Sequence, residues 1–126
     1  MAVYTTSNPT SLTTKLVYDS SADAGNDADG DNVTAATSGV VYMLQIDNTA
    51  NSGSAAYVKI VDASSAVPGT TTPVFVFYAP ASGKVTYNLP EGHIYSAGVS
   101  IWCSTSAATA DTTNPGSAVK VRILAT

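Results

Sequence analysis

The chain has 126 residues, a formal net charge of −4 and one cysteine, Cys103. A chain of this length forms one domain with one core and buries roughly two-thirds of the surface that its unfolded form exposes. The single cysteine excludes an intrachain disulfide and a multi-cysteine metal site. The five Lys and Arg residues are scattered in sequence, so we expect no basic patch and no nucleic-acid partner.

Low charge combines here with ample apolar content. Charged residues make up 11% of the chain, against about 25% in ordinary globular domains, while 44% of the residues are hydrophobic. We expect a folded protein that lies against other protein. No run approaches the roughly 18 apolar residues of a membrane helix, and "MAVYTTSNPTSLTT" lacks the features of a signal peptide. We therefore expect folding in the cytoplasm and no membrane partner.

Hydrophobic residues alternate with a period of two along most of the chain, which predicts β-strands. Residues 1–10 precede the first alternating run, and we expect them to form an extended N-terminal arm that reaches a neighbouring subunit. Turn-forming Gly, Pro, Asn, Asp and Ser separate the runs. The predicted strands are Ser11–Asp19, Gly39–Asn48, Ala55–Ala63, Pro73–Pro80, Gly83–Gly92, Ala97–Thr105 and Ser117–Ala125.

This spacing predicts an all-β fold: one domain, residues 1–126, built as an antiparallel β-sandwich of about seven to eight strands with jelly-roll or Ig-like topology. Several strands are apolar on both faces, and two stacked sheets explain only the inward set. The predicted core comprises Leu44, Ile46, Val58, Ile60, Val76, Val85, Tyr87, Leu89, Val99, Ile101, Val121 and Ile123. The predicted outward set, an interface with other subunits, comprises Val41, Met43, Phe75, Phe77, Trp102 and Leu124.

The segment "SSADAGNDADGDN", Ser20–Asn32, raises the possibility of a calcium site. It does not match an EF-hand: with Gly30 at position 6, Gly25 falls at position 1 and Ala36 at position 12, where calcium ligands are required. An irregular site of Asp27, Asp29 and Asp31 stays open. The favoured interpretation is a solvated loop, and we expect no cofactor.

Two further residues, His93 and Cys103, have side chains of types that can be catalytic. His93 follows Glu91 closely, but the chain has no second histidine and no nucleophile motif beside it. Cys103 falls on the same strand face as Val99 and Ile101, where a free cysteine packs as a small hydrophobe. We expect neither residue to be catalytic and the protein not to be an enzyme. A sugar-binding face of Tyr57, Tyr78, Tyr95 and Trp102 is the small-ligand alternative.

The block from Gly39 to Thr105 resembles small β-sandwich virion proteins of tailed bacteriophages. The resemblance is carried by "DN" (Asp47, Asn48), "YVKIVD" (Tyr57–Asp62), "PGTTTP" (Pro68–Pro73), a glycine turn at Gly83, "LPEG" (Leu89–Gly92) and "SAGVS" (Ser96–Ser100). It covers about half of the chain and consists of strands and turns rather than a catalytic motif.

The resemblance implies a capsid decoration (cement) protein that binds and stabilises the assembled phage head, or else a tail or fibre accessory protein. It implies the major capsid protein or other virion proteins as partners, a homo-oligomer, with a trimer as the expectation, and a location in the virion after assembly in the host cytoplasm. A carbohydrate- or calcium-binding β-sandwich module is the alternative.

Overall fold

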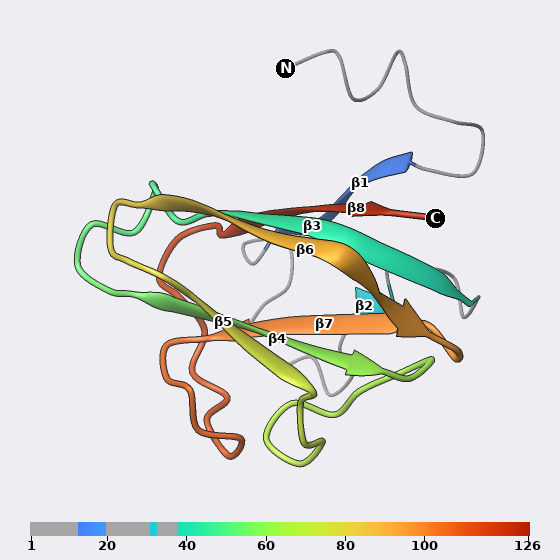
Figure 1. Ribbon diagram of the computed structural model, residues 1–126. Coiled ribbons are helices and arrows are strands. Elements are labelled where there is room, and N and C mark those ends of the chain that lie inside the picture. The colour runs from blue at the N-terminus through green and yellow to red at the C-terminus, as the bar shows by residue number, and fades with distance from the viewer. Residues whose placement is uncertain (1–12, 20–30, 33–37) are drawn as a thin grey trace.

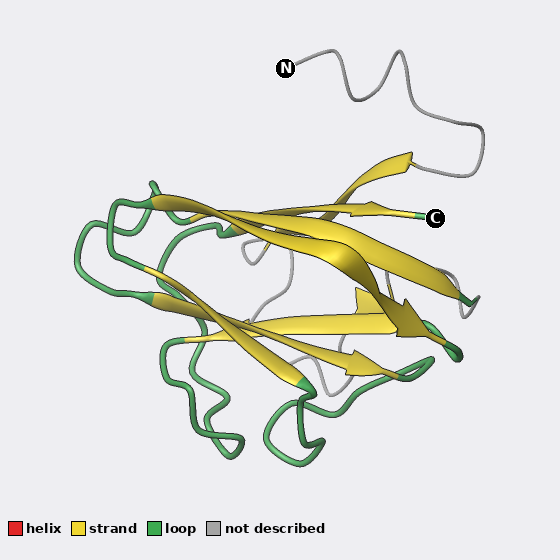
Figure 2. Ribbon diagram, viewed as in Figure 1, coloured by secondary structure: helices red, strands yellow, loops and turns green. Residues whose placement is uncertain are grey.

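The computed structural model describes residues 13–19, 31–32 and 38–126, with only the backbone described in the first two ranges. Every element in these residues is a strand and none is a helix, which confirms the predicted all-β, antiparallel fold (Figure 2). Residues 38–126 contain six strands, fewer than the seven to eight predicted. Two further strands, in residues 13–19 and 31–32, pair with two of these six. The eight are β1 (Thr13–Asp19), β2 (Asp31–Asn32), β3 (Gly39–Asp47), β4 (Ala56–Asp62), β5 (Phe75–Ala79), β6 (Lys84–Tyr95), β7 (Val99–Ser104) and β8 (Lys120–Ala125).

The strands form two antiparallel sheets that face each other as two layers (Figure 1). The first, here called the β3 sheet, has the order β1-β8-β3-β6, and the second, the β4 sheet, has the order β2-β7-β4-β5. Strands β5 and β6 follow each other along the chain but end up at the edges of different sheets. The hydrophobic core draws its residues from both sheets and lies between them. The N-terminal arm predicted for residues 1–10 lies outside the described residues.

Most of the predicted core is confirmed. Leu44, Ile46, Val58 and Ile60 are buried, as are their counterparts on β7 and β8, Val99, Ile101, Val121 and Ile123. Val85, Tyr87 and Leu89 of the edge strand β6 are half-buried and pack against this core. The inclusion of Val76 was wrong, because its side chain is exposed.

A bulge in β3 changes which side chains point inward. Tyr42 has no counterpart on β8, because Val41 pairs with Ala125 and Met43 with the adjacent Leu124. The extra residue shifts the alternation, so that Val41 joins Leu44 and Ile46 in the core. The same bulge is wider toward β6, where the four residues Leu89–Gly92 lie between the partners of Met43 and Val41. The "LPEG" sequence is therefore the bulged segment of an edge strand.

Strand β5 has the opposite phase to the one predicted. Phe77 and Ala79 are buried, and Phe75 packs against the core, while Val76 and Tyr78 face outward. The sequence "PVFVFYAP" is apolar at every strand position, so it offers no polar alternation that could fix the phase.

Two buried asparagines join three connections at one end of the molecule. The Asn48 side-chain amide donates to the carbonyls of Ser54 and Pro80, each at 3.0 Å. Asn51 donates to the Asn48 side-chain oxygen at 2.8 Å and to the Ser117 carbonyl at 2.9 Å, and it accepts from the Ser117 N–H at 2.8 Å. The "DN" motif thus ties the β3–β4, β5–β6 and β7–β8 connections together, since buried polar groups need partners of this kind.

Candidate functional site

The six predicted interface residues do not share one face. Met43 and Leu124 are paired neighbours on the outer face of the β3 sheet, and both are half-buried. Val41 and Phe77 lie in the core, so their assignment to an outward set was wrong, because of the bulge at Tyr42 and the reversed phase of β5. Phe75 also packs against the core, and Trp102 is buried. An interface role stays a prediction for Met43 and Leu124.

The exposed apolar row lies instead on the outer face of the β4 sheet. Val74, Val76 and Tyr78 alternate with the inward Phe75 and Phe77, and between 41% and 53% of each is exposed. The row follows β5, which is an edge strand and contains no charged residue. Edge strands of soluble proteins usually carry charge or a bulge that prevents pairing with another chain. Sequence reasoning missed this row because it placed Val76 in the core.

The four aromatic residues proposed as a sugar-binding face divide into two pairs. Tyr57 and Tyr78 lie side by side on the outer face of the β4 sheet, with ring centroids 5.4 Å apart and planes tilted by 58°. Tyr95 is buried and its hydroxyl donates to the Thr126 carbonyl at 2.8 Å. Trp102 is buried, and its Nε1–H has no hydrogen-bond partner among the described residues. Only the first pair is available to a ligand.

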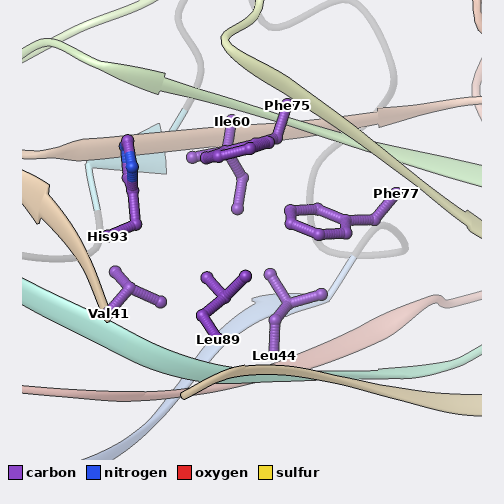
Figure 3. Close-up of a pocket in the computed structure, with 7 residues that line it drawn as sticks. All are labelled: Val41, Leu44, Ile60, Phe75, Phe77, Leu89 and His93. Carbon is purple, nitrogen blue, oxygen red and sulfur yellow. The ribbon is translucent and has the colours of Figure 1, made fainter. Parts of the chain in front are cut away.

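His93 lines a small apolar pocket between the edge strands (Figure 3), with Val41, Leu44, Ile60, Phe75, Phe77 and Leu89 as the other lining residues. The imidazole meets the Phe75 ring edge-on, with centroids 4.7 Å apart. The cavity of about 10 Å³ is no larger than the space that one water needs, and its lining offers water few polar partners. In the part of the chain that the structure describes, no hydrogen bond joins His93 to Glu91, so the geometry gives His93 a packing role.

Cys103 is buried in the core as a free thiol, the position predicted for it. Burial raises the pKa of the Cys103 thiol to about 12, which opposes formation of the reactive thiolate.

The calcium ligands suggested by the Asp-rich segment cannot be placed. Asp27 and Asp29 lie outside the described residues, and Asp31 is described only through its backbone pairing with Ile101. Within the described residues, no three His, Cys, Asp or Glu side chains are grouped as metal ligands.

Three of the five cationic residues meet on the outer face of the β3 sheet, which corrects the expectation that they are scattered. Lys84, Lys120 and Arg122 line a hollow of about 160 Å³ together with Gln45 and Asp47. Antiparallel pairing places Asp47 between Lys84 on β6 and Lys120 on β8. These residues are far apart in the sequence, so the cluster could not be recognised without the strand order.

Lys59 is fully buried on the outer face of the β4 sheet, where it pairs with Trp102. Its ammonium group donates to the Ala108 carbonyl at 2.6 Å, in the loop that follows β7. Desolvation lowers the pKa of Lys59, and the nearby Asp111 carboxylate partly offsets that effect. Because the Lys59 ammonium holds this loop in place through that hydrogen bond, we assign Lys59 a structural role.

The motifs that carry the family resemblance also have structural roles. Asp62, at the end of "YVKIVD", accepts hydrogen bonds from the N–H groups of Ser96 and Ala97 at 2.9–3.0 Å, and so holds the start of "SAGVS". In the loop containing "PGTTTP", the Val67 carbonyl accepts from the N–H groups of Thr70 and Thr71. These motifs build turns, which agrees with the view that they specify architecture rather than chemistry.

Comparisons of the chain with protein-family models, curated proteins and solved structures find no significant match. A separate search of the described residues for a helix long and apolar enough to cross a membrane finds none.

Proposed function

We propose that the protein is a structural component of a virion, specifically a capsid decoration (cement) protein that binds and stabilises an assembled phage head. The two facing sheets are, on this proposal, a β-sandwich of the Ig-like or jelly-roll kind. The support is the resemblance of the Gly39–Thr105 block to small virion proteins, together with the structural use of its motifs. The role is non-catalytic, and the partners are the major capsid protein or other virion proteins and further copies of this chain.

The observation that carries the proposal is the apolar row Val74, Val76 and Tyr78 on the uncharged edge strand β5. Burial of apolar side chains contributes about 25 cal/mol per Å² of surface removed from water. A partner that covers this row would therefore be stabilised by it. Repetition over many copies on a shell converts modest single contacts into stable attachment.

The test mixes the purified chain with heads of the phage that carries it, after the heads have been stripped of decoration protein. We expect the chain to sediment with the heads and to raise their resistance to heat. Val76→Asp places a charge in the apolar row and should weaken attachment at least tenfold. Ala107→Asp adds the same charge to an exposed position in the loop after β7 and should bind as the unaltered chain does.

Unaltered chain that stays in the supernatant with such heads, and stays monomeric at high concentration, would rule the proposal out. Sedimentation with isolated tails but not with heads would instead select the tail or fibre accessory role. Equal binding by Val76→Asp and the unaltered chain would remove the β5 row from the interface.

A second candidate, a carbohydrate-binding module, is favoured by one observation: the accessible Tyr57–Tyr78 ring pair. Binding of the chain to a glycan array that is lost in Tyr78→Ala would favour this candidate. The calcium-binding alternative predicts instead that calcium raises the melting temperature, since a ligand that binds only the folded state stabilises it.

A further inference from the structure

The outer face of the β3 sheet concentrates positive charge in a chain whose net charge is −4. Two cross-strand rows form the hollow described above. In the first, Asp47 pairs with Lys84 on one side and Lys120 on the other. In the second, Gln45 pairs with Thr86 on one side and Arg122 on the other. Three cations and the Asp47 carboxylate line the hollow, and Asp19 of β1 pairs with Lys120 beyond it, so the two rows carry a formal charge of 3 − 2 = +1.

The one carboxylate in the hollow is already engaged. Its Oδ1 accepts hydrogen bonds from the Thr49 N–H at 3.1 Å and the Thr49 hydroxyl at 2.5 Å. Its Oδ2 forms an ion pair with Lys84 Nζ at 3.2 Å. The Thr49 hydroxyl, then the Thr49 N–H and then the Lys84 ammonium lower the pKa of Asp47, so it stays ionised at neutral pH. Asp47 therefore neutralises Lys84. On β8, Lys120 also lies opposite Asp19 of β1, whereas the cross-strand partners of Arg122, Leu16 and Gln45, are uncharged.

Lys120 and Arg122 are exposed on the same face of β8, and neither side chain forms an ion pair or hydrogen bond with any of residues 38–126. Arg122 carries a planar group of donors that matches two oxygens of a carboxylate or phosphate at once. Gln45 lies on β3, between β8 and β6, and adds a neutral amide. Its Nε2 lies 3.4 Å from the Thr86 hydroxyl oxygen. The donors thus converge on the hollow from two neighbouring strands.

We propose that this hollow is an anion-binding site that takes one compact oxyanion group, a phosphate or a carboxylate, held by Lys120 and Arg122. Its volume of about 160 Å³ lies below the roughly 300–1,000 Å³ of pockets for drug-sized ligands, which suits a single charged group. The other cation in residues 38–126, Lys59, is buried on the outer face of the β4 sheet, beneath the loop after β7, so these residues offer no basic track for a polyanion. The site stands independently of the proposed virion role.

The test follows the amide and side-chain resonances of Gln45, Lys120 and Arg122 by NMR during titration with inorganic phosphate and, separately, with succinate. Sodium chloride holds the ionic strength constant. We expect saturable shifts confined to the hollow, with binding at least tenfold weaker in the double variant Lys120→Gln, Arg122→Gln. Saturation by phosphate alone would identify a phosphate site, saturation by succinate alone a carboxylate site, and saturation by both the shared oxyanion chemistry.

A matched control separates the site from the overall charge of the protein. The double variant Thr72→Asp, Ala107→Asp lowers the net charge by the same two units at exposed positions in loops after β4 and β7. It should bind as the unaltered chain does, and the spectra of both variants report directly that each is folded. Linear shifts with both anions, unchanged binding in the β8 variant, or equal loss in the control would each overturn the proposal.

Discussion

Asp62 acts on a segment distant in sequence. Its carboxylate collects hydrogen bonds from the Ser96 hydroxyl and from the N–H groups of Ser96 and Ala97, which fixes the turn between β6 and β7. The N–H of Ala97 and then that of Ser96 lower the pKa of Asp62, because both favour the charged form of the carboxyl group. The residue that ends strand β4 therefore positions a turn that begins 34 residues later.

We predict a specific pH dependence for this contact. Because the pKa of Asp62 is lower in the folded chain than its ordinary value of 3.8, ionised Asp62 stabilises the folded state fully above that value. The stabilisation is lost as the pH falls below 3.8 and through the folded pKa. The difference in unfolding free energy between the unaltered chain and Asp62→Asn, measured by urea denaturation, should therefore be largest near neutral pH and shrink in acid.

Glu91→Gln is the control for that measurement. Glu91 is an exposed carboxyl with no hydrogen bond to any of residues 38–126, so its substitution should not reproduce the acid-dependent difference. A difference for Asp62→Asn that stays constant from neutral pH to pH well below 3.8 would contradict the assigned role.

At the scale of elements, the bulged segment of β6 requires glycine at one position. Gly92 has a φ of +77°, and a Cβ placed there would overlap Val40 Cγ1. Gly92→Ala should therefore lower the unfolding free energy by about 1–3 kcal/mol, the usual cost of a strained left-handed residue. Gly53→Ala adds the same methyl group where nothing lies within 4 Å and should change stability by no more than about 0.5 kcal/mol. Thermal or urea melts compare the two, and equal losses would contradict the requirement.

The elements also show what the sequence could predict. Alternation located the six strands of residues 38–126 to within a few residues, because most of them have a buried and a less buried face; β7, buried at every position, was located by its β-forming residues and flanking turns. It placed Val41 wrongly, because the inserted Tyr42 changes the phase without leaving a mark in the hydrophobic pattern. It placed Phe77 and Val76 wrongly, because both faces of β5 are apolar. Phase is weakly specified wherever side-chain polarity does not alternate.

At the scale of the whole molecule, stability depends on a core shared by both sheets. Ile46 of β3 is fully buried in that core, while 75% of Ile94 in β6 is exposed. Ile46→Ala should cost about 2–5 kcal/mol, a large part of the roughly 5–15 kcal/mol that holds a domain folded. The same change at Ile94 should stay within about 0.5 kcal/mol. Calorimetry gives both values, and similar losses at the two positions would place the core elsewhere.

The candidate sites are long-range properties, and the sequence predicted them least well. Lys84, Lys120 and Arg122 meet only because β3 lies between β6 and β8, a strand order that local patterns do not encode. The prediction that His93 and Cys103 are not catalytic rested on missing partners in the sequence, and in the structure both side chains have apolar neighbours. Residue chemistry could be judged locally, while the grouping of charges required the topology.

The irregularity of β6 bears on how copies of the chain can assemble. Strands β6 and β5 are the edge strands of the two sheets on the same side of the molecule. In β6, four residues have no pairing partner on the adjacent strand, whereas the pairing of β5 is continuous. A regular edge strand can pair with a strand of another chain, whereas an interrupted edge strand resists such pairing. On this side of the molecule only β5 is fit for main-chain joining, and two copies joined there through twofold symmetry would form a closed pair that cannot lengthen into a fibre. A threefold assembly would need β5 to meet a different surface of the next copy, and the symmetry of the isolated oligomer therefore reports which contact is used.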